Sequence, residues 1–216
     1  MARNRKSPRP RDATATREVL LDAATLVFAE QGFAGARVDE IATRAGVNKA
    51  LIYAYYGDKK GIYRAVLASR MREFATPEFS EAIASEHGPR RALEDLIRRY
   101  LRMLIKDRPF ARLIAWEFLS HGREGRELIV EGARPLLDLI TELVKRGRAA
   151  GELRASMDAE LFRSTVVSLG IGYTVQHPAM ILARQRSGAE YTDEQFVDYV
   201  IRLLMESDRG VSRRSA

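Results

Sequence analysis

The stretch from Val38 to Tyr56 contains the residues whose types and spacing best suit a chemical role. It predicts a short helix, a tight turn and a second helix. Gly46 ends the first helix because glycine enters left-handed conformations at low cost, and Asn48 is a suitable N-cap for the second. Basic, small and hydroxyl-bearing residues then share the exposed side of the second helix: Lys49, Ala50, Tyr53 and Tyr55. Such a face suits contact with phosphates and with base edges in a major groove.

Apolar residues behind this face must hold the two helices at a fixed angle. Val38, Ile41 and Ala42 recur on one side of the first helix, and Val47 follows the glycine at the turn. Ile52 supplies an anchor from the second helix. A small residue at the helix contact, glycine at the turn and apolar anchors on both sides form the pattern of a helix-turn-helix.

The charge distribution also favours a polyanion partner. The chain of 216 residues has 36 basic and 29 acidic residues, a net charge of +7, and residues 1–64 hold 12 of the basic against 7 of the acidic ones. Residues 1–13 are rich in arginine and almost free of apolar side chains, which predicts a disordered arm. The arm is interpreted either as a solubilising tail or as a segment that lies along phosphates or enters a minor groove.

Several classes of protein are excluded by composition. The chain has no cysteine, and His87, His121 and His177 lie 34 and 56 residues apart, so no local metal site is expected. A glycine-rich phosphate loop and a nucleophile elbow are both absent, which argues against an enzyme and leaves no cofactor to expect. No apolar run approaches the roughly 18 residues that cross a bilayer, and no apolar stretch follows the basic start, so a cytoplasmic protein is expected.

Apolar residues recur with a helical period along the chain, without strand-like alternation, which predicts an all-α fold of about nine to ten helices. After the first helix, from Thr14 to about Gly32, further helices are expected near 58–75, 90–107, 109–120, 124–150, 158–175 and 192–207. The predicted organisation is a disordered arm over 1–13, a helix-turn-helix domain over 14–65, a second helical domain over 66–209 and a disordered tail over 210–216. A helix continues across residue 65 without a linker.

The span from about Thr16 to Leu67 resembles the DNA-binding domain of the tetracycline-repressor (TetR) family of transcriptional regulators. The resemblance rests on a series of matching segments: Phe28-Ala-Glu-Gln-Gly-Phe33, Ile41-Ala-Thr-Arg-Ala-Gly-Val47, Lys49-Ala-Leu-Ile-Tyr53, Tyr55-Tyr56 and Asp58-Lys59. It covers about a quarter of the chain closely, and the remainder matches in size, helix number and order.

The resemblance implies particular roles at the DNA. Lys49 and the backbone at Ala50 would lie nearest the bases, while Tyr53, Tyr55 and Lys59 would hold phosphates. Tyr56 replaces the family's usual buried phenylalanine and is interpreted as a core residue. Arg37 stands where the family usually has a Ser or Thr cap, and we take it as a further phosphate contact.

The resemblance also implies a regulatory and dimerisation domain from about residue 70. The segments Thr165–Tyr173 and Phe196–Leu204 would pair with their copies across a two-fold axis to form a homodimer. Aromatic residues and methionines suit an apolar or aromatic small-molecule effector. The predicted lining comprises Tyr100, Met103, Leu104, Phe110, Leu113, Trp116, Glu117, Phe118, His121, Phe162, Tyr173, Gln176, His177 and Met180. Glu117 either contacts a cationic or hydrogen-bonding ligand or, as we prefer, faces solvent or pairs with an arginine.

These expectations define a DNA-binding transcription regulator, a repressor that leaves a palindromic operator when its effector binds. The alternative from another class is an architectural DNA-binding protein without an effector, acting through its arm and basic head. A protein of the membrane surface is disfavoured, because the arm is basic but not amphipathic.

Overall fold

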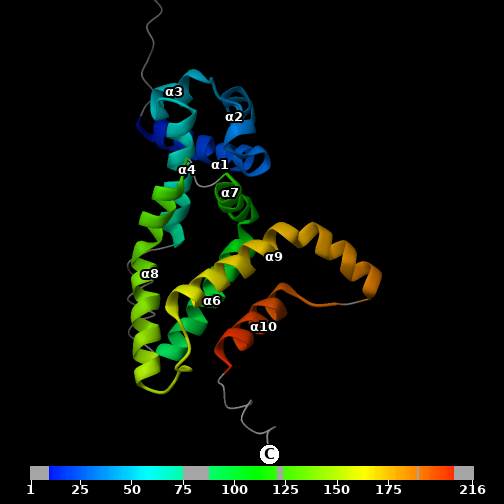
Figure 1. Ribbon diagram of the computed structural model, residues 1–216. Coiled ribbons are helices and arrows are strands. Elements are labelled where there is room, and N and C mark those ends of the chain that lie inside the picture. The colour runs from blue at the N-terminus through cyan, green and yellow to red at the C-terminus, as the bar shows by residue number, and fades with distance from the viewer. Residues whose placement is uncertain (1–9, 75–87, 121–123, 189, 207–216) are drawn as a thin grey trace, which may run out of the picture.

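The computed structural model describes residues 10–74, 88–120, 124–188 and 190–206. Within these ranges the chain forms nine α-helices and no strand, which confirms the all-α prediction. Figure 1 shows the first four helices packed together at one end of the molecule, with later helices extending away from them, namely α6 (Pro89–Lys106), α8 (Arg126–Ala149), α9 (Ala159–Ser187) and α10 (Asp193–Met205).

The N-terminal domain consists of α1 (Pro10–Gly35), α2 (Val38–Ala45), α3 (Ala50–Tyr56) and α4 (Lys59–Phe74). Its core is made of side chains that are almost completely buried, among them Leu20, Val27, Phe28, Ile41, Ile52 and Ile62. Val38, Ala45 and Val47 pack against this core as expected. The core therefore fixes α2 and α3 relative to α1.

The first helix differs from the prediction at both ends. It begins at Pro10, inside the segment expected to be a disordered arm, and residues 1–9 lie outside the described residues. Proline is well tolerated in a first helical turn, where its missing N–H has no partner to lose. Gly32 interrupts the helix at φ 67° and ψ 177°, as expected of a terminating glycine, although helical turns resume up to Gly35.

The turn between α2 and α3 has the predicted chemistry. Gly46 adopts the left-handed conformation at φ 67° and ψ 26°. Lys49, one residue after the predicted Asn48, holds the N-cap position of α3 and forms no side-chain cap there. The Asn48 side-chain oxygen nevertheless accepts a hydrogen bond of 2.8 Å from the Ala50 N–H, satisfying one of the free donors at the start of α3.

The C-terminal domain is built from five helices; four of them, α6, α8, α9 and α10, form a second core, while the apolar residues of α7 belong to the cluster of the N-terminal domain. They are α6 (Pro89–Lys106), α7 (Arg108–Leu119), α8 (Arg126–Ala149), α9 (Ala159–Ser187) and α10 (Asp193–Met205). Figure 1 shows α4 and the start of α8 side by side, and the two helices pack against each other. α4 thus runs from the N-terminal domain to the C-terminal domain without a break, as predicted.

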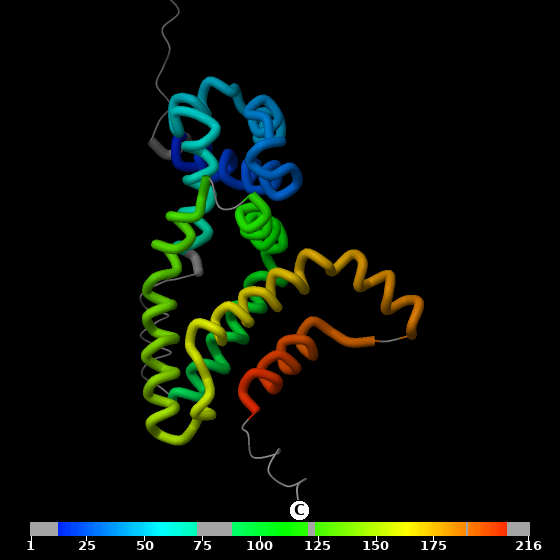
Figure 2. The backbone as a smooth tube through the Cα atoms, in the orientation of Figure 1, coloured from blue at the N-terminus to red at the C-terminus, as the bar shows by residue number. Residues whose placement is uncertain are grey.

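α9 is longer than the predicted helix and continues through Pro178 to Ser187. Figure 2 shows its second half extending away from α6 and α8 before the chain returns along α10. An 18-residue window of α9 has a mean hydropathy of 1.3, so by length and composition α9 could cross a membrane, contrary to expectation. A third of that window is buried in the fold, and core helices of soluble proteins commonly have the same character.

Gly46 provides a test of this turn. The site of a Cβ at Gly46 is open, so Gly46→Ala should cost only the strain of a left-handed φ, about 1 kcal/mol of unfolding free energy. Gly46→Asn should cost less, because asparagine tolerates this region. Urea unfolding at fixed protein concentration measures both, and equal losses for alanine and asparagine would contradict the backbone explanation.

Candidate DNA-binding surface and effector cavity

The exposed face of α3 carries three of the residues expected at DNA. Lys49, Ala50 and Tyr53 are exposed, and Tyr53 retains 49% of its accessible surface. Tyr55 is half-buried, with the Arg17 guanidinium 4.8 Å from its ring centroid. Tyr53 is therefore exposed as predicted, whereas Tyr55 is less exposed than predicted because it packs against the N-terminal core.

Lys49 is engaged by an acidic neighbour from α2. Its ammonium lies 2.8 Å from a carboxylate oxygen of Asp39, and this contact raises the pKa of Lys49. Both side chains are exposed, so the ion pair is screened by solvent and can exchange for another anion. A phosphate that approaches Lys49 has to compete with Asp39.

Lys59 has a different environment from the one that the resemblance implies. Its ammonium donates to the carbonyl oxygens of Ala36 at 2.8 Å and Ala34 at 3.3 Å, and it lies 4.7 Å from the ring centroid of Phe33. These contacts join the start of α4 to the end of α1. The geometry therefore gives Lys59 a structural role, and its phosphate contact stays a prediction.

Arg37 and Tyr56 occupy positions compatible with their predictions. Arg37 is exposed at the N-cap position of α2 and forms no side-chain cap there, so a phosphate contact stays a prediction. Tyr56 is half-buried against the core, and its hydroxyl donates to the Arg17 carbonyl oxygen at 3.3 Å. Burial raises the pKa of Tyr56.

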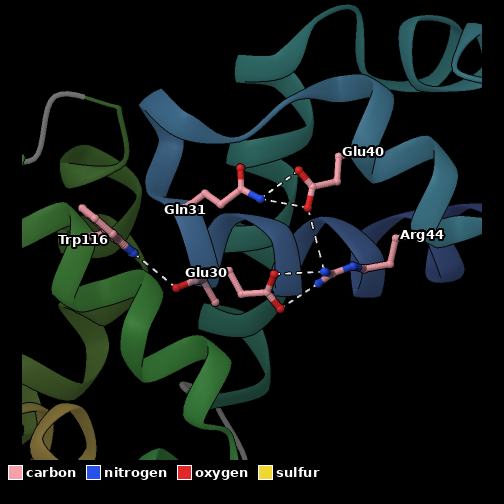
Figure 3. A network of polar contacts seen from close by, with 6 residues as sticks. Glu30, Gln31, Glu40, Arg44 and Trp116 are labelled. Atoms are coloured by element: carbon pink, nitrogen blue, oxygen red, sulfur yellow. Dashed lines mark hydrogen bonds and ion pairs between the residues drawn. The ribbon is translucent and has the colours of Figure 1, made fainter.

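A polar network holds α2 against α1 (Figure 3). Arg44 donates two hydrogen bonds of 2.8 and 2.9 Å to the carboxylate of Glu30, and Gln31 donates to both oxygens of Glu40 at 2.8 Å. The paired geometry fixes direction as well as distance. It orients α2, and through the turn it orients α3.

An apolar cavity of about 230 Å³ lies between α4, α6, α7, α8 and α9. Six of the fourteen predicted ligand residues line it: Tyr100, Met103, Leu104, Phe110, Phe118 and Phe162. The cavity therefore forms where sequence reasoning expected a ligand site, in the middle helices. Burial raises the pKa of Tyr100 above its usual range.

The other predicted ligand residues that the structure describes lie outside the cavity lining. Leu113 is buried in the core, and Trp116 and Glu117 face the N-terminal domain. On α9, Tyr173 stacks on Phe196 with ring centroids 3.7 Å apart, and His177 lies 3.0 Å from Arg108. Gln176 is exposed and Met180 half-buried further along α9, outside the cavity lining, and His121 lies outside the described residues.

Sequence reasoning missed the wall that α8 contributes. Apolar residues of α8 line the cavity at helical spacing: Ile129, Val130, Ala133, Leu136, Leu137 and Ile140. Met71, Ile114, Val166 and Val167 add to the wall from other helices. The periodicity was visible in the sequence, but the same spacing describes an ordinary core helix. Arg163 is the one charged side chain lining the cavity among the described residues, and it pairs with Glu160.

Glu117 corrects the preferred expectation of a solvent-facing or arginine-paired carboxylate. It is only 2% exposed, and one carboxylate oxygen accepts a hydrogen bond from the Tyr63 hydroxyl. The other oxygen accepts from the Gly125 N–H at 2.9 Å. Burial and the neighbouring Glu117 raise the pKa of Tyr63. The carboxylate thus links α7 to α4 and to the start of α8.

The chain matches two family models that together cover most of the described structure. Residues 20–66 match the bacterial regulatory proteins of the tetR family, and residues 89–200 match the tetracyclin repressor-like C-terminal domain. The combination of a helix-turn-helix head and this second domain defines a class of bacterial regulators. The chain belongs to the tetR family.

Curated relatives agree with this assignment. The HTH-type transcriptional repressor SCO4008 of Streptomyces coelicolor is 37% identical over 112 residues, which is 52% of this chain and about half (54%) of that repressor. The HTH-type transcriptional regulator RutR of Escherichia coli K12 is 31% identical over 66% of this chain and 68% of its own. The fatty acid metabolism regulator protein of Bacillus subtilis 168 is 26% identical over 68% of this chain and 75% of its own.

Solved structures share the fold. The fatty acid degradation regulator FadR from Bacillus halodurans superposes with a TM-score of 0.72 at 23% identity, over 94% of this chain and 99% of that one. FadR from Bacillus subtilis, solved in complex with stearoyl-CoA, gives a TM-score of 0.69 at 23% identity, over 88% and 97% of the two chains.

The exposed face of α3 leads to a prediction for Lys49. Lys49→Ala should weaken binding to a specific DNA site by about 1–3 kcal/mol, because the substitution removes a contact near the bases. Lys145→Ala, which removes an exposed lysine of α8, is the matched control and should leave affinity unchanged. Fluorescence anisotropy on a DNA site obtained by selection measures both affinities. Equal losses of affinity in the two variants would show that Lys49 contributes only its charge and makes no specific contact.

The Asp39–Lys49 pair leads to a prediction with the opposite sign. Asp39→Asn should tighten DNA binding about three- to tenfold at low salt, because it releases Lys49 and removes a negative charge beside the phosphates. The gain should shrink as salt rises. The double variant Asp39→Asn/Lys49→Ala should lose most of the gain. Unchanged affinity in Asp39→Asn would show that the pair does not compete with DNA.

Proposed function

We propose that the protein is a sequence-specific DNA-binding transcription regulator, a repressor that leaves its operator when a small apolar effector enters the cavity. The observation that carries the proposal is one chain holding both an exposed face on α3 and an apolar cavity between α4 and the helices of the C-terminal domain. The repressor relative SCO4008 supports the sign of regulation. The proposed location is the bacterial cytoplasm, and no catalytic activity is proposed.

A homodimer is part of the proposal. Large apolar side chains are exposed along α9 and α10: Leu161, Val175, Ile181, Leu182, Tyr199 and Leu203. Pairing these two helices with their copies would cover these side chains and explain the high hydropathy of α9. A two-fold axis would also present two copies of α3 to the two halves of a palindromic operator.

The cavity supports an effector with an apolar chain or ring. Its walls are aliphatic and aromatic, and Arg163 provides one charged group among the lining residues described. The fatty acid metabolism regulator of Bacillus subtilis is a relative, and the solved FadR of that species binds stearoyl-CoA. We therefore propose a fatty acyl compound as the first effector class to test.

Selection of bound sequences from a random DNA library tests the DNA-reading half of the proposal. A palindromic motif, lost in Lys49→Ala, is the expected result. Binding without any enriched motif, falling only as salt rises, would favour the architectural alternative.

A cavity variant tests the effector half. Palmitoyl-CoA, free palmitate and an aromatic probe are titrated against the protein–operator complex. Val166→Trp should fill the cavity and raise the releasing concentration at least tenfold, with operator affinity unchanged, because the indole takes the space of the ligand. Asp138→Trp, at an exposed position of α8 outside the cavity lining and the proposed dimer surface, is the matched control. Release that is equally impaired in both variants would place the effector outside this cavity.

A further inference from the structure

We propose that Glu117 is a coupling residue: its buried carboxylate, held by Tyr63 and the Gly125 N–H, transmits movement of the cavity wall to the DNA-reading domain. We call these three groups the carboxylate latch. The inference deepens the proposed function, because it assigns the route from the effector cavity to the reading helices. It rests on the positions of the latch and of the cavity in the same three helices.

The latch joins three helices at one point. Tyr63 belongs to α4, Glu117 to α7, and Gly125 is the N-cap of α8. Space at this point is limited, since a Cβ added at Gly125 would lie 2.2 Å from Leu67 of α4 and 3.1 Å from the Glu117 carboxyl carbon. The start of α8 therefore cannot shift far toward α4 or α7 without rearranging both.

The same three helices also supply the cavity wall. Met71 of α4 lies two turns beyond Tyr63, and Ile129 of α8 lies one turn beyond Gly125. On α7, Ile114 and Phe118 line the cavity directly beside Glu117. A ligand that spreads the wall must displace these helices relative to one another, and the displacement acts on the hydrogen bonds of the latch.

Tyr63 carries the effect into the reading domain. Its side chain is 1% exposed, and its ring packs against Phe28 and Phe33 of α1 with centroid separations of 4.8 and 5.1 Å. The ring is thus part of the core that holds α1, while its hydroxyl binds a carboxylate of the second domain.

Two further polar contacts near the latch join α7 and the start of α8 to the N-terminal domain. The Trp116 indole N–H donates to the Ala29 carbonyl oxygen at 3.2 Å (Figure 3). Lys60 at the start of α4 lies 3.1 Å from the Glu124 carboxylate. A buried carboxylate is costly once its donors withdraw. The latch therefore favours two discrete arrangements over a gradual loosening: either both hydrogen bonds to the Glu117 carboxylate are intact, or the carboxylate has found new partners. A switching element requires such discrete states.

Unfolding of the protein alone tests the latch without an effector. Trp116 is the only tryptophan of the chain and lies at the domain interface, so its fluorescence reports that interface while far-UV circular dichroism reports all helices. At fixed protein concentration, the parent should give coincident urea transitions. In Tyr63→Phe and in Glu117→Gln, the fluorescence transition should move to lower urea than the helix transition.

The controls remove the same groups elsewhere. Tyr191→Phe deletes a hydroxyl before α10, and Glu94→Gln neutralises a carboxylate in the Arg90–Glu94 pair of α6. Both should keep the two transitions together. If the latch variants shift both transitions equally, Glu117 and Tyr63 serve stability alone and the proposal is wrong.

Operator release separates the latch from the proposed function. With palmitoyl-CoA as the probe, each latch variant should bind the probe within about twofold of the parent. The ratio of the operator dissociation constant with the probe to that without it should be at least about fivefold smaller in each variant than in the parent. In the double variant this ratio should be no smaller than in either single variant, because both substitutions break the same latch. An unchanged ratio overturns the proposal. If palmitoyl-CoA leaves the parent bound to DNA, the acyl effector is rejected, while the unfolding comparison still decides the latch.

Discussion

Burial of α7 against α1 is the contact on which the rest of the molecule depends. Leu113 and Ile114 of α7 belong to the same apolar cluster as Val27 and Phe28 of the reading domain, so the two domains share part of one core. Apolar burial is not directional, and hydrogen bonds are needed to fix one arrangement. Polar groups of α7 meet that need, because they bind a backbone carbonyl of α1 and a hydroxyl of α4.

The same helix, α7, also lines the cavity. One side of α7 faces the cavity and the other faces the N-terminal domain. No flexible linker separates the two sides, so a shift of α7 at the cavity also changes its packing on the N-terminal domain. Such a helix can serve regulation only if the effector binds one arrangement better than the other, since equal affinity shifts no population. An empty space of modest size between five helices is a place where packing can differ between two states at small cost.

The reading domain was largely predictable because its signals are local. Helical period, the left-handed Gly46 and the hydrogen bond of Asn48 all act within a few residues; Gly46 ends α2 as predicted, and Asn48 binds the start of α3 from one residue before its N-cap position. Contacts between distant residues were not predictable in this way. Nothing in the sequence links Tyr63 to Glu117, which are 54 positions apart, and the periodicity of α8 does not distinguish a cavity wall from solid core. The length of α9 was underestimated because Pro178 was tolerated inside it.

Gly32 carries a consequence for how such proteins can be recombined. Its φ of 67° brings the backbone under the Trp116 indole, where a Cβ would lie 2.9 Å from the ring. The glycine of the head and the indole of the second domain therefore form a matched pair. A chimera that joins this head to another relative's second domain would need a compatible residue facing position 32. The N-terminal domain can therefore be exchanged only together with the surface of α7 that packs against it.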